Sequence, residues 1–227
     1  MGKGEGAGKD GHGDGAGDGG GAEVLSLRER KKRATRQRIS NIATALFMER
    51  GFDQVSVAEV ARGAEVSTMT VFNYFPRKED LYFDRVPEAV EVFTGAVRHR
   101  RPGESPLAAL RRLAVQLLDQ RHPLAGLNDR FPAFWQVVID SPALRARARE
   151  SLEEIENALA AAMAETAPET PDPALTAALV IAAYRAVCVT TARRLLAGER
   201  AAELAEDHTA RMLAAFDTLE RALAPGR

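Results

Sequence analysis

The apolar and polar positions of this 227-residue chain first become regular at Arg28. From there, apolar side chains recur at helical spacing, at Ile39, Ile42, Ala43, Leu46 and Phe47. Gly51 follows at the position where a left-handed residue commonly ends a helix. The pattern predicts a first helix over residues 28–50 with one buried face.

A short second helix is predicted directly afterwards. Ser56 and Glu59 have the S-x-x-E spacing of a capping box, in which the two residues satisfy free backbone N–H groups at the start of a helix. One apolar face then continues through Val57, Val60, Ala61 and Ala64. The second helix is therefore expected to end near Ala64.

Ser67 can cap a third helix, because a serine side chain accepts a hydrogen bond from a free N–H group of the first turn. Val71 and Phe75 fall on the inward face of this helix. Pro76 ends it, since the residue before a proline is pushed out of the helical conformation. The second and third helices are joined by a very short connection, so together they form a helix-turn-helix.

Almost all of the remaining chain has a helical pattern interrupted by proline and glycine. The predicted helices cover residues 78–100, 106–121, 129–140, 142–165, 173–197 and 201–224. No run alternates as a strand would. We therefore expect an all-α fold, with a three-helix helix-turn-helix domain at residues 25–85 and a helical bundle at residues 86–227.

Composition changes this picture mainly at the N-terminus. Residues 1–22 hold 11 of the 18 glycines and almost no apolar side chain, so they cannot repay the entropy lost on ordering. Residues 1–24 are therefore expected to be a disordered, glycine-rich tail.

The cysteine count and the hydropathy point to a reducing, cytoplasmic setting. Cys188 is the only cysteine, so no internal disulfide can form, and the N-terminus lacks an apolar run of the signal-peptide kind. The most apolar segment, residues 174–192, is interrupted by Tyr184 and Arg185. Because a charge is costly in lipid, we interpret this segment as a buried helix and expect no membrane partner.

The net charge of −1 hides an uneven distribution. Residues 23–85 carry twelve basic side chains against nine acidic ones, a net charge of +3, and seven of the twelve lie between Arg28 and Arg38. Such a block is often only a solvated helix face, but its density at a helix start favours contact with a polyanion.

The outward face of the third helix is suited to reading DNA. A helix that enters the major groove reads base edges with residues near its N-terminus, while flanking groups hold phosphates. Thr68, Met69 and Thr70 lie at the reading end, and Asn73 can pair with adenine. Tyr74, Lys78, Arg33 and Arg36 are candidates for the DNA backbone, as are the free N–H groups after Ser67. The alternative is a short core helix with polar residues facing solvent.

These residues also carry a family resemblance. The run "VSVAEVARGAEVSTMTVFNYFPRKEDLY" resembles the DNA-binding domain of the tetracycline-repressor (TetR) family of bacterial transcription regulators, in its capped second helix, its aromatic third helix and the P-x-K-E-x-L that follows. The resemblance covers about a quarter of the chain. It implies a homodimer that binds a near-palindromic operator in double-stranded DNA, usually as a repressor, and leaves it when a small molecule enters the C-terminal domain.

Position by position, the resemblance implies two kinds of contact. Base and groove contacts fall to Ser67, Thr68, Met69, Thr70 and Asn73, and phosphate contacts fall to Phe72, Tyr74 and Lys78, with support from Ser56. The sequence departs from the family at three positions. Glu65 replaces a common Gly in the turn, Phe72 replaces a frequent Tyr, and Arg77 replaces a frequent capping Ser.

The C-terminal half offers a candidate ligand site lined by aromatic residues. Its candidate residues are Phe93, Phe131, Phe134, Trp135, Tyr184, Arg185 and Cys188. A cavity between bundle helices with a few polar groups suits a small molecule. The alternative is that the aromatic side chains are core and that Arg185 forms an internal ion pair rather than meeting an anionic ligand.

The last two helices suggest a dimer interface. Ala178, Ala182 and Ala186 permit close approach of helices, and the final helix has an apolar stripe that includes Leu213 and Phe216. Two such helices from each subunit would make a four-helix interface with two-fold symmetry. Packing within one chain could absorb the same stripe.

An enzyme is not indicated. The four histidines are far apart and no metal-ligand, G-x-S-x-G or Walker spacing occurs, so we expect no metal, cofactor or catalytic residue. Two alternatives to a ligand-responsive repressor stay open. One is a small-molecule-binding or catalytic helical bundle with a vestigial DNA-binding domain, and the other is a DNA-binding protein without ligand sensing.

Overall fold

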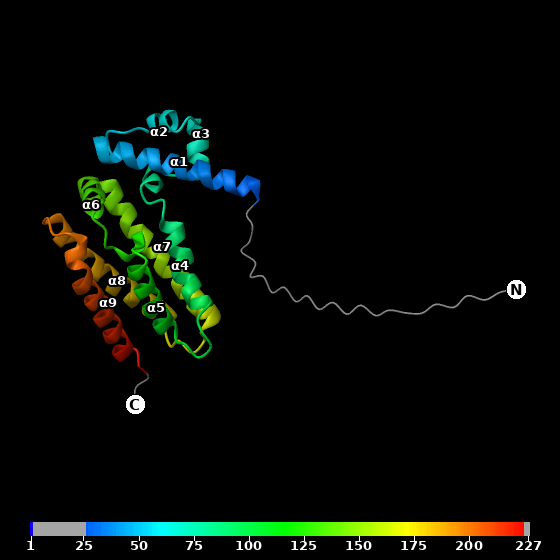
Figure 1. Ribbon diagram of the computed structural model, residues 1–227, viewed down its shortest axis with the longest axis vertical. Coiled ribbons are helices and arrows are strands. Elements are labelled where there is room, and N and C mark those ends of the chain that lie inside the picture. The colour runs from blue at the N-terminus through cyan, green and yellow to red at the C-terminus, as the bar shows by residue number, and fades with distance from the viewer. Residues whose placement is uncertain (2–25, 225–227) are drawn as a thin grey trace. The chain divides into compact units, whose positions relative to one another are not determined.

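The computed structural model describes residue 1 and residues 26–224, so the predicted glycine-rich tail lies almost entirely outside the described residues. The chain divides into two compact units, residues 1–35 and residues 36–227. Over the described ranges no strand occurs, which confirms the all-α prediction. The helices are α1 (Leu27–Arg50), α2 (Val57–Gly63), α3 (Thr68–Tyr74), η1 (Lys78–Leu81), α4 (Val86–Arg98), α5 (Pro106–Asp119), η2 (Pro123–Ala125), α6 (Phe131–Asp140), α7 (Pro142–Thr166), α8 (Pro173–Leu196) and α9 (Ala201–Ala222) (Figure 1).

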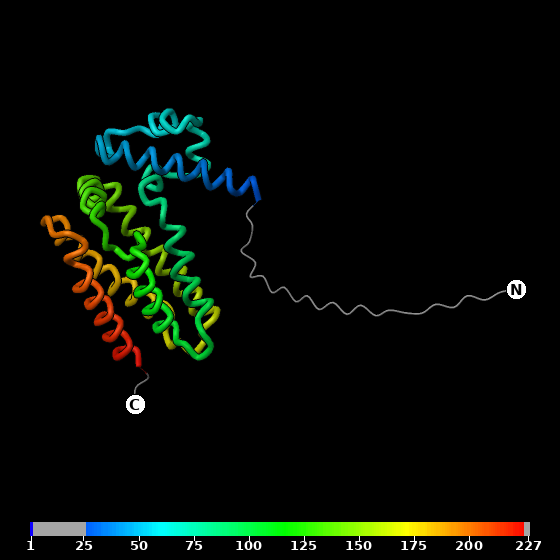
Figure 2. Tube along the Cα trace, in the orientation of Figure 1, coloured from blue at the N-terminus to red at the C-terminus, as the bar shows by residue number. Residues whose placement is uncertain are grey.

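The prediction of one helix over residues 78–100 is wrong. The segment contains the short 3₁₀-helix η1, then a break, and then α4 from Val86, as the Cα trace in Figure 2 shows. Arg77 precedes η1 without a side-chain cap, and Pro87 lies in the first turn of α4. A proline has no N–H to donate, so it suits the start of a helix and disfavours its interior.

In the first unit, the described residues form the N-terminal turns of α1. Ser26 and Glu29 make a capping box, because the Ser26 N–H donates to Glu29 Oε2 at 2.9 Å and the Glu29 N–H donates to Ser26 Oγ at 3.2 Å. The Ser26 hydrogen bonds hold the pKa of the Glu29 carboxyl below its usual value. The basic side chains of residues 28 and 30–33 are exposed.

The second unit contains two hydrophobic clusters. The first belongs to the helix-turn-helix domain and includes Phe47, Val60 and Phe75 from the region of α1 to α3. Val138 from α6 and Leu144 from α7 belong to the same cluster. The core under the helix-turn-helix therefore includes the corner where α6 meets α7.

The second cluster fills the helical bundle. Neighbouring pairs are α4 with α5, α4 with α7, α7 with α8, and α8 with α9, and they lie side by side in Figure 1. Phe93, Leu159, Val180 and Phe216 represent four of these helices in the cluster. By length and apolarity α8 would also suit a membrane span, but its contacts with α7 and α9 are those of a core helix in a bundle.

Candidate nucleic-acid interface and bundle interior

The turn between α2 and α3 is formed by a residue in the left-handed conformation. Glu65 has a φ of 52°. Its N–H donates to the Arg62 carbonyl at 3.1 Å, and the next N–H, that of Val66, donates to the Ala61 carbonyl at 3.0 Å. This pair of bonds is a Schellman motif, which normally has glycine at the position of Glu65. The turn is thus built as it would be with glycine, at the cost of a strained backbone.

The start of α3 is held by Ser67, as predicted. The Thr70 N–H donates to Ser67 Oγ at 3.0 Å, and the hydroxyls of Ser67 and Thr70 are 2.8 Å apart. Val71 is buried below the helix, and so is Phe75 just after it. The first turn of α3 is therefore fixed from inside, while its outer side stays open.

The outer face of α3 is unusual in its apolar exposure. Thr68 and Asn73 are exposed, and Met69 and Phe72 keep 69% and 42% of their surface in contact with solvent. Tyr74 is partly buried. Hydroxyl, amide, thioether and aromatic groups on one short helix can meet base edges and thymine methyl groups in a major groove. Phe72 has no hydroxyl with which to bond a phosphate.

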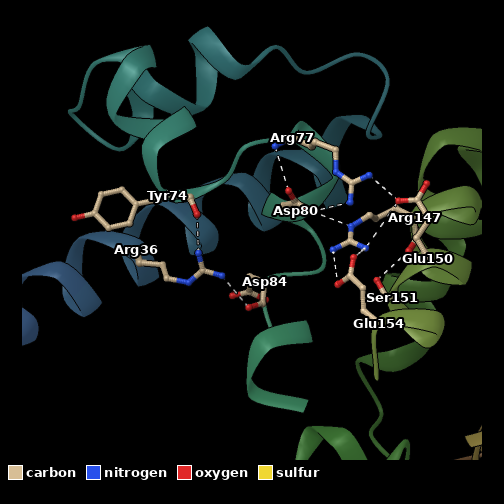
Figure 3. Close-up of polar contacts among 9 residues, drawn as sticks. All are labelled: Arg36, Tyr74, Arg77, Asp80, Asp84, Arg147, Glu150, Ser151 and Glu154. Carbon is tan, nitrogen blue, oxygen red and sulfur yellow. Dashed lines mark hydrogen bonds and ion pairs between the residues drawn. The ribbon is translucent and has the colours of Figure 1, made fainter. Parts of the chain in front are cut away.

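Arg36 turns inward to the end of α3. Its guanidinium donates to the carbonyl of Tyr74 at 2.9 Å and to the carbonyl of Asp84 at 3.1 Å (Figure 3). It also lies 4.2 Å from the centre of the Phe75 ring. A carbonyl at the end of a helix lacks an intrahelical partner, so Arg36 satisfies one and fixes the end of α3. This positioning role was missed by the sequence reasoning, and a contact of Arg36 with the DNA backbone stays a prediction.

Lys78 also has a partner within the domain. Its ammonium donates to the Phe52 carbonyl at 2.6 Å and lies 4.1 Å from the centre of the Phe52 ring. Burial lowers the pKa of this ammonium. Lys78 thus connects η1 to the loop after α1. An ammonium has three N–H donors, so the predicted phosphate contact remains open.

Ser56 and Arg33 are two further residues predicted to contact DNA, and both are exposed. Ser56 is exposed at the start of α2, where its N–H donates to Glu59 Oε2 at 2.8 Å, which confirms the capping box. The hydrogen bonds from Ser56, together with one from Arg50, lower the pKa of the Glu59 carboxyl to about 2. Arg33 is exposed in the first unit.

The structure places three of the predicted ligand residues together inside the bundle. The Phe93 and Tyr184 rings meet edge to face with centres 5.4 Å apart. The Tyr184 hydroxyl donates to the Leu124 carbonyl at 2.8 Å, and Cys188 lies one helical turn further along α8. Burial raises the pKa of the Tyr184 hydroxyl above its usual value.

The other predicted ligand residues lie elsewhere. Phe131, Phe134 and Trp135 are on α6, where Phe134 stacks on the Tyr82 ring with centres 4.5 Å apart. The Trp135 indole N–H is buried and has no hydrogen-bond acceptor among the described residues. Arg185 is exposed on α8. The predicted set is therefore divided between the bundle core, the α6 aromatic group and the surface.

A further group was missed because its partners are far apart in the sequence. Arg147 is buried in α7 and pairs with Asp80 of η1. In the sequence, Arg147 precedes the acidic residues Glu150, Glu153, Glu154 and Glu156, and such a run is typical of a solvated helix face. The available signal was the spacing of Leu144, Arg147 and Ser151, which puts all three on one face of the helix; the structure buries all three.

Three comparisons relate these features to known proteins. Residues 39–84 match the sequence model of the family described as bacterial regulatory proteins, tetR family. The HTH-type transcriptional regulator TcmR of Streptomyces glaucescens is 29% identical over 164 residues, which cover 71% of this chain and 73% of TcmR.

Two solved structures share the fold. SmeT in its complex with triclosan superposes with a TM-score of 0.54 at 17% identity, over 83% of this chain and 91% of that one. NalD, the secondary repressor of the MexAB-OprM multidrug efflux pump in Pseudomonas aeruginosa, superposes with a TM-score of 0.51 at 18% identity, over 81% of this chain and 97% of that one. Together, the comparisons cover both the helix-turn-helix and the bundle.

Proposed function

We propose that this chain, which belongs to the TetR family of DNA-binding transcriptional regulators, is a cytoplasmic homodimeric repressor that a small molecule releases from its operator. The observation that carries the proposal is the exposed face of α3. Thr68, Met69 and Phe72 project from a helix that is capped at its start and tied to Arg36 at its end. A rigid helix with an open, chemically mixed face is what reading base edges requires.

Reading and holding the DNA fall to different groups in this proposal. Ser67, Thr68, Met69, Thr70 and Asn73 contact bases and the groove, whereas Tyr74 and Lys78 hold phosphates with support from Ser56. The exposed basic residues near the start of α1, including Arg33, add affinity that falls as salt rises, because they release counterions from the DNA. Phe72 contributes apolar contact only.

The dimer is supported by the surface of α8. Leu175 and Leu196 are exposed near its two ends, and Ala182 and Ala186 are exposed between them. Small and apolar side chains along one helix face allow a second copy to approach closely. A two-fold dimer presents two copies of α3 to two half-sites, so its operator is near-palindromic.

The ligand we propose is an aromatic or lipophilic compound with a hydrogen-bond acceptor. Trp135 supports this class, because its buried N–H lacks an acceptor among the described residues and such a donor is costly to leave unpaired. Phe93 and Tyr184 supply aromatic surface deeper in the bundle. The complex of SmeT with triclosan is an example of such a ligand on the same fold.

The test follows DNA release and ligand binding in one titration. Trp135 is the only tryptophan, so its fluorescence reports on the α6 region while the anisotropy of a labelled operator reports on DNA. A true effector changes both signals at the same concentration. At about 100 times its dissociation constant, it also stabilises the DNA-free protein by about 2.7 kcal/mol. Trp135→Phe keeps the aromatic surface and is expected to weaken the effector while keeping operator affinity.

Two results would contradict the proposal. If compounds bind the protein but the ligand-free protein binds no operator, a ligand-binding bundle with a vestigial DNA-binding domain is favoured. Operator binding that no aromatic or lipophilic compound alters, with no shift in melting temperature, would favour a DNA-binding protein without ligand sensing.

A further inference from the structure

Arg147 forms ion pairs with Asp80, Glu150 and Glu154 from a nearly buried position. Only 8% of its side-chain surface is exposed. Its Nε donates to Asp80 Oδ1 at 2.8 Å, and its Nη1 donates to Glu154 Oε1 at 2.7 Å. Burial by itself lowers the pKa of the guanidinium, but the bonds to Glu154 and Asp80 outweigh burial and raise it. Arg147 is therefore held charged between the bundle and η1.

A second arginine completes the group from the opposite side. Arg77 donates to Glu150 Oε2 at 2.6 Å, and its backbone N–H donates to Asp80 Oδ2 at 3.1 Å. We call Arg77, Asp80, Arg147, Glu150 and Glu154 the η1–α7 charge cluster (Figure 3). Two arginines and three carboxylates give it a net charge of −1. The cluster connects the segment that directly follows α3 to one face of α7.

Apolar and polar contacts near the start of α7 form a second connection. The Tyr82 hydroxyl donates to the Phe134 carbonyl at 3.0 Å, and the Ser141 hydroxyl donates to Asp53 Oδ1 at 3.1 Å. Leu144 is buried in the core of the helix-turn-helix domain. Arg147 and Glu150, the α7 residues that bond Asp80 and Arg77, lie three and six residues after Leu144, which corresponds to about 4.5 and 9 Å along the helix axis. Two separated connections determine an orientation, whereas the apolar corner alone leaves a rotation free.

The orientation matters because of the path from the cluster to the reading helix. Arg36 bonds the Tyr74 carbonyl at the end of α3 and the Asp84 carbonyl just beyond η1. In the sequence, Asp80 lies between Tyr74 and Asp84, the two residues that Arg36 bonds. A shift of η1 relative to α7 is thus transmitted to α3 through short, hydrogen-bonded segments.

We infer that Arg147 is a positioning residue that sets the angle of the reading helix on the bundle and thereby the half-site spacing that the dimer accepts. The inference rests on the proposed function, since only a dimer has a spacing to select. The reading helices of a two-fold dimer must enter grooves about 34–36 Å apart, or a multiple of this. A fixed angle of α3 makes one spacing strongly preferred.

Removal of the Arg147 charge loosens this angle. Asp80 keeps Arg77 as its partner. Arg77 is then the one arginine left in the cluster to balance the three carboxylates of Asp80, Glu150 and Glu154. The net charge of the cluster changes from −1 to −2, and like charges at close range repel. The connection near the start of α7 is left in place, so the domain stays folded while its orientation broadens.

The experiment compares spacings and not only affinities. The wild-type protein selects a duplex from a random pool, and the central spacer of that duplex is then lengthened or shortened by one and by two base pairs. Dissociation constants are measured on this series for the wild type, Arg147→Met, Asp80→Asn and the double variant. Arg149→Met is the matched control, because Arg149 is an exposed arginine of the same helix. Circular dichroism and sedimentation confirm that each variant is folded and dimeric.

We expect the discrimination between the selected and the altered spacings to fall about tenfold in Arg147→Met, which corresponds to about 1.4 kcal/mol. Asp80→Asn should lower it similarly, and the double variant should lower it no further, since both residues act through one contact. The salt dependence of binding should not change, because Arg147 releases no counterions from DNA. Arg149→Met should match the wild type.

Two results separate failure of this inference from failure of the proposed function. If the wild type selects two half-sites with a sharp spacing preference and folded Arg147→Met keeps that preference, the inference is wrong and the proposed function stands. If the wild type selects no paired half-sites, the dimeric operator-binding function is wrong, and the inference falls with it.

Discussion

Glu65 allows a direct test of the turn before the reading helix, because mutations can separate the energetic cost of its left-handed backbone from the effect of its side-chain charge. The left-handed φ of 52° is unfavourable for any residue with a Cβ atom, by about 1–2 kcal/mol. Glycine removes this cost but gives the unfolded chain more freedom, which offsets about 0.4–1 kcal/mol. The Glu65→Gly variant should therefore be more stable than the wild type by about 0.5–1 kcal/mol.

Thermal unfolding measures this difference. For a protein of this size, about 1 kcal/mol corresponds to about 2–4 °C in the melting temperature. Glu65→Gln removes the charge and keeps the Cβ atom, so it should melt like the wild type. Glu65→Asn should be intermediate, because asparagine tolerates the left-handed region better than glutamate does. The two hydrogen bonds of the Schellman motif come from the backbone and should persist in every variant.

Two orders of stability would contradict a backbone cost at Glu65. If Glu65→Gln gains as much stability as Glu65→Gly, the wild type is destabilised by the charge and not by the backbone. If Glu65→Gly is less stable than the wild type, the strained turn is not a net cost.

Three further predictions concern the bundle. Gly126→Ala should lower the free energy of unfolding by about 2–4 kcal/mol, because Gly126 has a φ of 77° and a Cβ atom there would lie 2.5 Å from Cys188 Sγ. Thermal unfolding measures the loss, and adding Cys188→Ala should restore part of it. Cys188 should react slowly with a disulfide reagent at neutral pH, since burial raises the pKa of its thiol to about 12 and the thiolate is the reacting form; stopped-flow labelling that is fast in the native state would contradict this. His208 is buried between Thr191 and the Ala125 carbonyl, and burial lowers its pKa. As the pH falls, the His208 imidazole is therefore protonated in the unfolded chain at a higher pH than in the folded protein. The free energy of unfolding should then fall as the pH drops below about 6.5. The fall measured by denaturant titration should be smaller in His208→Gln.

Helix boundaries could be predicted well because the signals that end helices are local. Ser56 and Ser67 cap α2 and α3 as expected, and the other long helices agree with their predicted ranges to within two residues at each end. The segment 78–100 was the exception, because apolar periodicity continues across the break between η1 and α4. A capping serine at position 77 would have marked the first start, and Arg77 stands there instead.

Partners of charged side chains could not be predicted, since they depend on tertiary contacts. Arg36 belongs by sequence to a basic block suited to DNA, yet its partner is a carbonyl 38 residues away. Arg147 pairs with a carboxylate 67 residues away. Arg185 is the opposite case. Its charge within an apolar helix predicted a side chain that faces the bundle interior, but in the structure Arg185 is exposed. Periodicity identifies the face of a helix but not the element that covers it.

The measurement that tests the central claim most directly is the binding of the purified protein to DNA from immediately upstream of its own gene. Fluorescence anisotropy is recorded with that duplex and with a scrambled duplex of the same composition, at two salt concentrations. If α3 reads sequence, the upstream duplex is bound more tightly, the preference survives at the higher salt, and the Thr68→Ala, Asn73→Ala variant loses it. Equal binding to both duplexes that disappears at the higher salt would show phosphate attraction alone and would contradict sequence reading by α3 at this DNA.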